Sequence, residues 1–280
     1  MTKGPTGALS LALHLRVRPD RAEIAADQLW GLGATAIEER GDKRGTTILV
    51  AGFVDDVTTR AAATALGADA TVQTIDAAVW DAWRDHASPA AAGGQLLVVP
   101  AWIDPPSTDR TVLLLDPGPV FGSGAHASTQ LVLEAFDQID LDWRTLLDVG
   151  CGSGVLSIAA ALLGARQAVG IDIDPEAVAI TNENAERNGV GDRVEVSTTL
   201  LADVTGRFDV VAANILRPAL LDMAPDLAAR VGEGGHLVLS GLLTDQADAV
   251  VAAVTAADGS LTEVDRLHSD GWAAPVITQL

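Results

Sequence analysis

The chain has 280 residues and a formal net charge of −20, and 48% of its residues are hydrophobic. This composition is typical of a globular protein with a sizeable core, and it excludes a disordered or fibrous chain. No apolar run approaches the ~18 residues that a membrane-spanning helix needs, so no membrane partner is expected. The single cysteine, Cys151, excludes an internal disulfide and fits a reducing compartment. We therefore expect a soluble, cytoplasmic protein.

The acidic charge narrows the range of partners. The chain has 18 basic and 38 acidic residues, and only Lys3 and Lys43 are lysines. An acidic surface repels the phosphates of nucleic acids and attracts basic proteins, so we expect no direct binding to DNA or RNA. The charge also fits a requirement for solubility or a high-salt environment, and the sequence does not choose between these explanations.

Residues 1–76 are predicted to form a small N-terminal domain. Strand-like segments alternate with two segments whose apolar residues recur at helical spacing and which end at a glycine. The predicted order is strand 9–17, helix 21–33, strand 34–40, strand 46–53, helix 55–67 and strand 70–76. This βαββαβ order predicts a ferredoxin-like fold.

A connector and a larger domain follow. Residues 77–95 begin with Trp80 and Trp83 at helical spacing and then contain a Ser-Pro and a Gly-Gly dipeptide, which predicts a helix followed by a linker. In residues 96–280, continuous apolar strands alternate with helical segments. Such strands are typical of a parallel sheet that helices cover on both faces, so we expect a doubly wound, Rossmann-like α/β domain.

The segment 145–165, TLLDVGCGSGVLSIAAALLGA, carries the clearest chemical signal. An apolar strand ends near Asp148, and Gly150, Gly152 and Gly154 form a turn into an alanine-rich helix, where glycine lets the backbone approach a ligand. A second apolar strand ends at Asp172, whose carboxylate can accept hydrogen bonds from both hydroxyls of a ribose. At the carboxyl edge of a doubly wound sheet, these features predict a cofactor site.

Two kinds of cofactor fit this plan. A dinucleotide site has a GxGxxG pattern and places a pyrophosphate on the helix N-terminus. This chain instead has GxGxG, with Asp148 two residues before the first glycine. That pattern is typical of S-adenosylmethionine-dependent methyltransferases, whose cofactor has no phosphate and whose cationic amine and sulfonium tolerate a carboxylate. We therefore expect S-adenosyl-L-methionine as the cofactor, and methyl transfer in preference to nucleotide redox chemistry.

Asn214 lies just beyond the fourth strand predicted for this sheet. Amino methyltransferases have a polar residue at this place, often in an Asn-Pro-Pro-aromatic motif, and its carboxamide oxygen holds the amine. Ile215 and Leu216 replace the prolines here, which leaves no aromatic platform for a planar base or amide. A flexible aliphatic amine is therefore the expected acceptor. The alternative is that Asn214 caps the helix that follows.

The chain resembles the PrmA family, the bacterial methyltransferases of large-subunit ribosomal protein eleven. The resemblance covers nearly the whole chain and rests on WDAWRDHASP, LLVVPAW, DPGPVFGSGAHAST, LLDVGCGSGVLSIAAALLGA, VGIDIDPEAV, NENAERNGV, VAANIL and GGHLVLSGLL. It implies a protein N-methyltransferase that uses S-adenosylmethionine and methylates lysine side chains or the N-terminal amine of a basic, lysine-rich ribosomal protein. It further implies that residues 1–76 recognise this substrate and that residues 96–280 catalyse the reaction. We expect a monomer.

The resemblance also assigns the site residues. The family's loop reads close to AFGTGxHxTT and closes over the cofactor, and residues 121–129 of this chain read FGSGAHAST. The implied cofactor contacts are Phe121, His126, Thr129, Gly150, Gly152, Asp172 and Asn214. Asn214 is also the implied catalytic residue, beside the transferred methyl group. Ser123 and Ser128 stand where the family has threonines, and Ala87 stands where an aromatic residue is usual after the linker histidine.

Other functions fit the sequence less well. A hydrolase would pair Ser123 or Ser128 with His126, but the chain has no GxSxG elbow. A lysine methyltransferase of another protein, such as the electron-transfer flavoprotein β-subunit, is an alternative, although that group is usually shorter at the N-terminus. A catalytically inactive ribosome-associated binding module would keep the fold without the chemistry.

No metal is expected, because the histidines are scattered without ligand spacing. Asp148 and His126 are both candidates for a general base.

Overall fold

The computed structural model describes residues 10–41, 45–53, 56–75, 87–118 and 124–280. Contacts between residues divide the chain into two compact units, Met1–Ala87 and Ser88–Leu280. Residues 76–86 lie outside the described residues. They include the first part of the predicted connector at 77–95 and the helix predicted there. No helix of the described residues is both long and apolar enough to cross a membrane.

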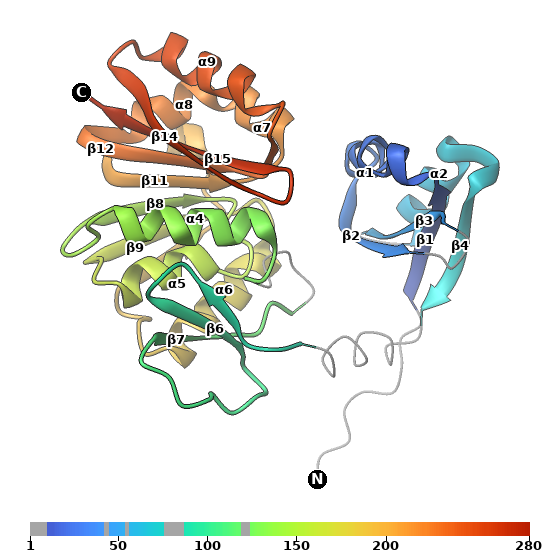
Figure 1. Cartoon of the computed structure of the whole chain (residues 1–280), viewed down its shortest axis with the longest axis horizontal. Helices are drawn as coiled ribbons and strands as arrows, with labels where there is room; N and C mark the ends of the chain where they lie inside the picture. Colours follow the sequence, from blue (N-terminus) through green and yellow to red (C-terminus); the bar gives the residue numbers. More distant parts are fainter. Residues whose placement is uncertain (1–9, 42–44, 54–55, 76–86, 119–123) are drawn as a thin grey trace. The chain divides into compact units, whose positions relative to one another are not determined.

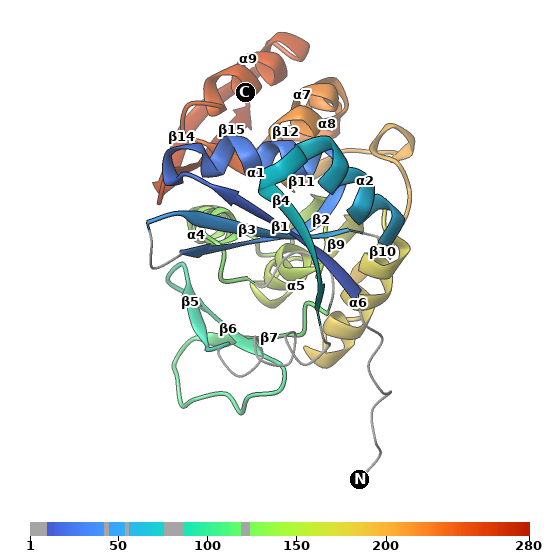
Figure 2. The ribbon, with the colours of Figure 1, turned by 90° about the vertical axis from the view of Figure 1, so that its right-hand side faces the viewer.

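The N-terminal unit has the predicted order of elements. They are β1 (Ser10–Val17), α1 (Ala22–Gly31), β2 (Ala34–Gly41), β3 (Thr47–Phe53), α2 (Asp56–Leu66) and β4 (Ala70–Ile75). The sheet is antiparallel and has the order β2-β3-β1-β4. Figure 2 shows α1 and α2 on one face of this sheet, and Leu13, Leu29 and Leu49 are buried in the core of the unit. The predicted ferredoxin-like fold is confirmed.

The second unit is built on a large, mainly parallel sheet. Its strands are β8 (Thr145–Val149), β9 (Gln167–Ile171), β10 (Val194–Ser197), β11 (Phe208–Asn214), β12 (Val231–Ser240), β13 (Leu242–Leu243), β14 (Leu261–Ser269) and β15 (Trp272–Gln279). They lie in the order β10-β9-β8-β11-β12-β15-β13, and β14 pairs with β15. The pairs from β10 to β12 are parallel, and every pair with β15 is antiparallel.

Helices cover both faces of this sheet (Figure 1). They are α4 (Ala127–Gln138), α5 (Val155–Leu162), α6 (Pro175–Arg187), α7 (Arg217–Asp222), α8 (Ala224–Arg230) and α9 (Ala247–Ala257). Successive residues of a strand face opposite cores, so that Leu146 packs in the core with residues of α4 and α5, and Leu147 in the core with residues of α7, α8 and α9. Every residue of β8 is buried, which is why this strand is apolar except at Asp148 and Thr145. The predicted doubly wound fold is confirmed.

A small sheet precedes the first helix of this unit. β5 (Ala90–Ala92) is antiparallel to β6 (Leu96–Pro100), and β6 is parallel to β7 (Thr111–Leu115). β5 therefore lies within the range that the sequence assigned to the connector. Arg110 stabilises the turn between β5 and β6, because its Nη1 donates to Gly93 O at 2.7 Å and to Leu96 O at 3.1 Å. The chain then leaves β7 toward α4.

An arginine directly precedes each of the parallel strands of the large sheet. In the order of the sheet, these residues are Arg193, Arg166, Arg144, Arg207 and Arg230. Helices of a doubly wound fold end at this edge, and their last carbonyl groups need donors. Arg193 Nη1 donates to Ala161 O at the end of α5, and Arg230 Nη1 donates to Val204 O in the loop before β11. Much of the positive charge of this unit thus lies opposite the carboxyl ends of the strands.

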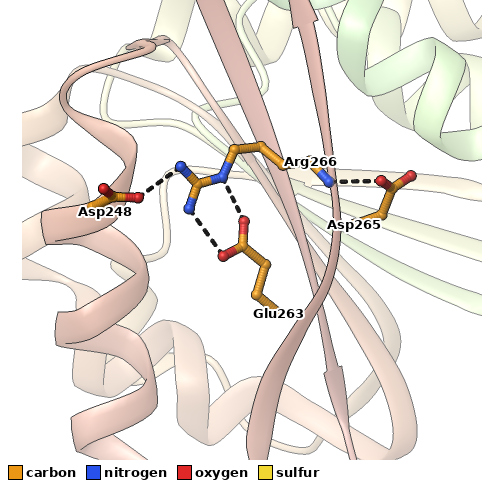
Figure 3. A network of polar contacts seen from close by, with 4 residues as sticks. All are labelled: Asp248, Glu263, Asp265 and Arg266. Atoms are coloured by element: carbon orange, nitrogen blue, oxygen red, sulfur yellow. Dashed lines mark hydrogen bonds and ion pairs between the residues drawn. The ribbon is translucent and has the colours of Figure 1, made fainter.

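A charged network connects the antiparallel part of the sheet to a helix (Figure 3). Arg266 of β14 donates from Nε to Glu263 Oε1 at 2.6 Å and from Nη2 to Glu263 Oε2 at 2.9 Å. Its Nη1 donates to Asp248 Oδ1 of α9 at 2.7 Å. The paired bonds to Glu263 fix the guanidinium plane. Asp248 is exposed, so its ion pair contributes about 1 kcal/mol or less.

Candidate active site

Three neighbouring strands end together at the carboxyl edge of the large sheet. The chain passes from β8 to β9 on one side, and β11 later pairs with β8 on the other side, so the strand order reverses here. Ligands of doubly wound sheets bind in the crevice outside such a point. The glycine loop follows β8, Asp172 follows β9, and Asn214 is the last residue of β11. The structure therefore brings these predicted site residues to one edge.

The glycine loop, residues 150–154, has no room for side chains at two of its glycines. Gly150, Gly152 and Gly154 have φ values of 75°, 53° and 80°, in the left-handed region that favours glycine. A Cβ at Gly150 would lie 2.4 Å from Ile215 Cγ2, and one at Gly154 would lie 2.4 Å from Thr181 Cγ2. The loop is thus packed between the segment after β11 and helix α6, and its glycines have no side chain that would keep a ligand away.

Asp148 lies inside the domain beneath the glycine loop. It is fully buried, and its Oδ2 accepts hydrogen bonds from Ser157 N–H at 3.0 Å and from the Ser157 hydroxyl at 2.7 Å. Its Oδ1 has no hydrogen-bond partner among the described residues. Burial raises the pKa of Asp148 to about 6, and the bonds from Ser157 oppose that shift. At neutral pH, Asp148 is therefore a buried charge that Ser157 compensates only in part.

The side chain of Asp172 is hydrogen-bonded directly to the glycine loop. Its Oδ2 accepts a hydrogen bond from Gly152 N–H at 2.9 Å, and its Oδ1 accepts one from Asp174 N–H at 3.0 Å. Each carboxylate oxygen has more than one lone pair, so both oxygens can still accept a hydrogen bond from a ligand hydroxyl. The side chain is therefore held in position while it keeps acceptor capacity for the predicted ribose.

His126 is the N-cap residue of α4. Its Nδ1 accepts a hydrogen bond from Ser128 N–H at 3.3 Å and lies 2.8 Å from Ser128 Oγ. A nitrogen that accepts carries no proton, and burial lowers the pKa of His126, so both effects favour the neutral ring. The ring also lies edge-on to Trp272 of β15, with centroids 4.9 Å apart. His126 thus has a structural role at the start of α4 that the sequence did not indicate.

Asn214 and Thr129 form a hydrogen bond between β11 and α4. Asn214 Nδ2 donates to Thr129 Oγ1 at 3.1 Å, and Thr129 is 1% exposed. Asn214 Oδ1 is buried and has no partner among the described residues. A buried acceptor without a donor is unfavourable, so this oxygen is suited to a ligand N–H. The alternative that Asn214 caps the next helix is wrong, because the N-cap residue of α7 is Leu216.

Sequence reasoning missed two polar residues that hold these parts together. Ser240, the last residue of β12, is buried and donates its hydroxyl to Ser128 O at 2.9 Å. Thr181 of α6 donates its hydroxyl to Gly152 O at 2.9 Å. The place of Ser240 at the end of a strand beside β11 could have indicated it, whereas Thr181 lies on a helix and has no such signal. Phe121 and Ser123 lie outside the described residues, so their implied roles stay predictions.

The strand order and the glycine loop at the switch point define a class, the Rossmann-like class I S-adenosylmethionine-dependent methyltransferases. Comparison with known proteins identifies the family within this class. Residues 44–279 match the model of the family described as ribosomal protein L11 methyltransferase (PrmA). The chain belongs to this family.

Individual relatives agree with the family match. The ribosomal protein L11 methyltransferase of Geobacter sulfurreducens is 49% identical over 186 residues, which cover 66% of this chain and 61% of that protein. The one of Sorangium cellulosum is 40% identical over 263 residues, which cover 88% of this chain and 83% of that protein. The chain therefore spans less than two thirds of the first relative and most of the second. The crystal structure of a ribosomal protein L11 methylase from Lactobacillus delbrueckii subsp. bulgaricus is 33% identical, has a TM-score of 0.63, and is matched over 69% of this chain and 98% of that chain.

Proposed function

We propose that this protein transfers methyl groups from S-adenosylmethionine to amino groups of ribosomal protein L11, at lysine side chains, at the N-terminal amine, or at both. The observation that carries this proposal is the buried Oδ1 of Asn214, an acceptor that lacks a partner among the described residues, at the carboxyl end of β11. Membership of the family supports the substrate, since the relatives in Geobacter sulfurreducens and Sorangium cellulosum are named for it.

Asn214 would orient the amine of the substrate. Its Nδ2 is bonded to Thr129 Oγ1, so the carboxamide cannot turn without losing that bond, and the direction of Oδ1 is fixed. An amine that donates one N–H to this oxygen has its lone pair turned in a defined direction. Alignment of a nucleophile with the carbon it attacks is a large part of what such a displacement requires. A lysine amine, with an ordinary pKa of about 10.4, must first lose a proton, and desolvation in the site favours its neutral form.

The same edge of the sheet has the groups that would hold the cofactor. When it is bound, S-adenosylmethionine supplies an electrophilic methyl group on a positively charged sulfur. The residues that we assign to it are Phe121, His126, Thr129, Gly150, Gly152, Asp172 and Asn214. Asp172 would accept hydrogen bonds from the ribose hydroxyls, because its oxygens keep lone pairs beside the glycine loop. A carboxylate at this place and the buried charge of Asp148 suit a cationic ligand and disfavour a pyrophosphate.

The acidic charge and the N-terminal unit bear on the protein substrate. We assign substrate recognition to residues 1–76 and catalysis to residues 96–280, with residues 77–95 as a connector that lets the catalytic domain reach several amines. A net charge of −20 attracts a basic, lysine-rich protein and disfavours direct contact with nucleic acid. We further propose that the protein acts as a monomer in the cytoplasm, without contact to a membrane.

Methyl transfer from labelled S-adenosylmethionine to purified L11 tests the proposal. The variant is Asn214→Ala, and the matched control is Asn182→Ala, because Asn182 is exposed and its Nδ2 donates to Val178 O of its own helix. We expect the wild type and the control to label L11, and Asn214→Ala to be slower by roughly 100-fold, since the amine loses its orientation. Because Asn214 is one of several assigned cofactor contacts, binding of S-adenosylhomocysteine, measured by calorimetry, should weaken by far less than the rate of methyl transfer.

Each other outcome refutes a different part of the proposal. Label on another large-subunit protein, with none on L11, would refute the substrate. Equal rates for Asn214→Ala and Asn182→Ala would refute the role of Asn214. A wild-type chain that neither binds S-adenosylhomocysteine nor transfers label would refute methyl transfer itself.

A further inference from the structure

Two asparagines at the C-terminal end of α6 form hydrogen bonds with the backbone at the end of β7, as a neighbouring strand would. Asn188 Oδ1 accepts a hydrogen bond from Leu114 N–H at 2.8 Å, and its Nδ2 donates to Leu114 O at 2.7 Å. Asn184 Oδ1 accepts one from Asp116 N–H at 3.0 Å, and its Nδ2 donates to Asp116 O at 2.9 Å. Each carboxamide thus satisfies both backbone groups of one residue on the side of β7 that faces away from β6.

The spacing of the two asparagines explains why a helix can take this position. Residues four apart on an α-helix are about 6 Å apart along its axis, and residues two apart on a strand are separated by about 6.6 Å. Asn184 and Asn188 therefore reach Leu114 and Asp116, whose backbone groups point to the same side of the strand. Between them, Glu186 is exposed, and Arg187 Nη1 donates a hydrogen bond to Asn184 Oδ1, which also holds that carboxamide.

Asn184 has a further contact that Asn188 lacks. Its Nδ2 also donates to Ser153 O at 2.9 Å, within the glycine loop. The second donor bond of Asn188 goes instead to Asn184 O of its own helix, at 2.8 Å. Asn184 is fully buried, and its single NH₂ group joins Asp116, where the chain leaves β7 toward α4, to Ser153, the residue before the N-cap of α5.

We propose that Asn184 is a positioning residue for cofactor binding, which holds the glycine loop against Asp116 at the end of β7. This inference rests on the proposed cofactor site. The loop is part of that site, so a ligand that contacts the loop backbone needs the loop in one fixed position. A site whose parts are already fixed binds more tightly, because binding does not have to order them. Asn188 only attaches β7 to α6.

The comparison of Asn184→Ala with Asn188→Ala tests this inference in the full-length chain. Both variants remove a carboxamide that bonds to β7, so both should lower the melting temperature. Only Asn184→Ala frees the glycine loop, and we expect it to raise the Kd for S-adenosylhomocysteine by about tenfold, the equivalent of about 1.4 kcal/mol. The KM for S-adenosylmethionine should rise in parallel, and the KM for L11 should stay within about twofold. Asn188→Ala should leave the Kd within about twofold.

A second variant keeps the test decisive if Asn184→Ala does not fold. Asn184→Asp keeps the acceptor for Asp116 N–H and removes both donor bonds, and Asn188→Asp is its matched control. Equal changes in Kd for the Asn184 and Asn188 variants, or no change for either, would overturn the inference while the wild type still binds the cofactor. A wild type that does not bind S-adenosylhomocysteine would overturn the proposed function, and this inference with it.

Discussion

The close approach of Gly150 to Ile215 makes Gly150→Ala a severe substitution. The φ of 75° at this residue costs an L-amino acid about 1–2 kcal/mol. The new Cβ would also lie 2.4 Å from Ile215 Cγ2, and overpacking of this kind costs about 1–3 kcal/mol. The two costs together destabilise the domain by about 2–5 kcal/mol, which lowers the melting temperature of a unit of this size by about 4–20 °C. The affinity for S-adenosylhomocysteine should fall as well, since the loop must move.

Gly189→Ala separates the two contributions. Gly189 has a φ of 67°, but a Cβ there would meet no atom within 4 Å, so only the conformational cost of about 1–2 kcal/mol applies. In the double variant Gly150→Ala with Ile215→Ala, the methyl group that causes the clash is absent. The double variant should therefore lose less stability than the two single variants lose in total. Thermal unfolding of the wild type, of Gly150→Ala, Gly189→Ala and Ile215→Ala, and of the double variant measures this. Equal losses for Gly150→Ala and Gly189→Ala, or strict additivity in the double variant, would refute the close packing.

Two expectations concern pH. Because the pKa of Asp148 is raised to about 6, its stabilisation is complete below the usual value of 3.8 and is lost as the pH rises through about 6. The unfolding free energy of Asp148→Asn, measured by chemical denaturation, should therefore rise relative to that of the wild type by about 2 kcal/mol between pH 4 and 7. A constant difference between the two would contradict this. The pKa of His126 is lowered by burial, so its stabilisation is complete above 6.5 and is lost as the pH falls through the lowered pKa. His126→Asn, which can still cap α4, should lose less stability than the wild type between pH 6.5 and 5. Melting temperatures that fall in parallel for the two chains over this range would show that the imidazole does not titrate there.

The parts of the fold that the sequence predicted are those with a strong local signal. The parallel strands are unbroken apolar runs because helices cover both faces of the sheet, and the glycine loop marks the end of β8. β5 was not predicted, because Ala90–Ala92 has little strand propensity and pairs only because β6 lies beside it. Its strand conformation depends on tertiary contacts that no short segment shows.

The same distinction holds within the candidate site. Gly150 and Asp172 directly follow strands and Asn214 ends one, so their position at one edge could be derived from the order of the strands. Asn182 and Asn184 look alike in the sequence, but Asn182 is exposed and Asn184 is fully buried. The difference comes from Asp116, which directly follows β7 and lies 68 residues earlier in the chain. Contacts of this range carry no local pattern.

The pairing of α6 with β7 also affects an open edge of the small sheet. β7 is the last strand of its small sheet, and a strand in that position offers free N–H and C=O groups to another chain. Asn184 and Asn188 occupy these groups at Asp116 and Leu114. A further strand beside β7 would itself have unpaired backbone groups on its outer side. A helix does not, because its backbone N–H and C=O groups are already bonded within the helix. The two side chains therefore occupy backbone groups at Leu114 and directly after β7, whose sequence TVLLL is apolar and β-branched enough to add to a sheet of a second molecule.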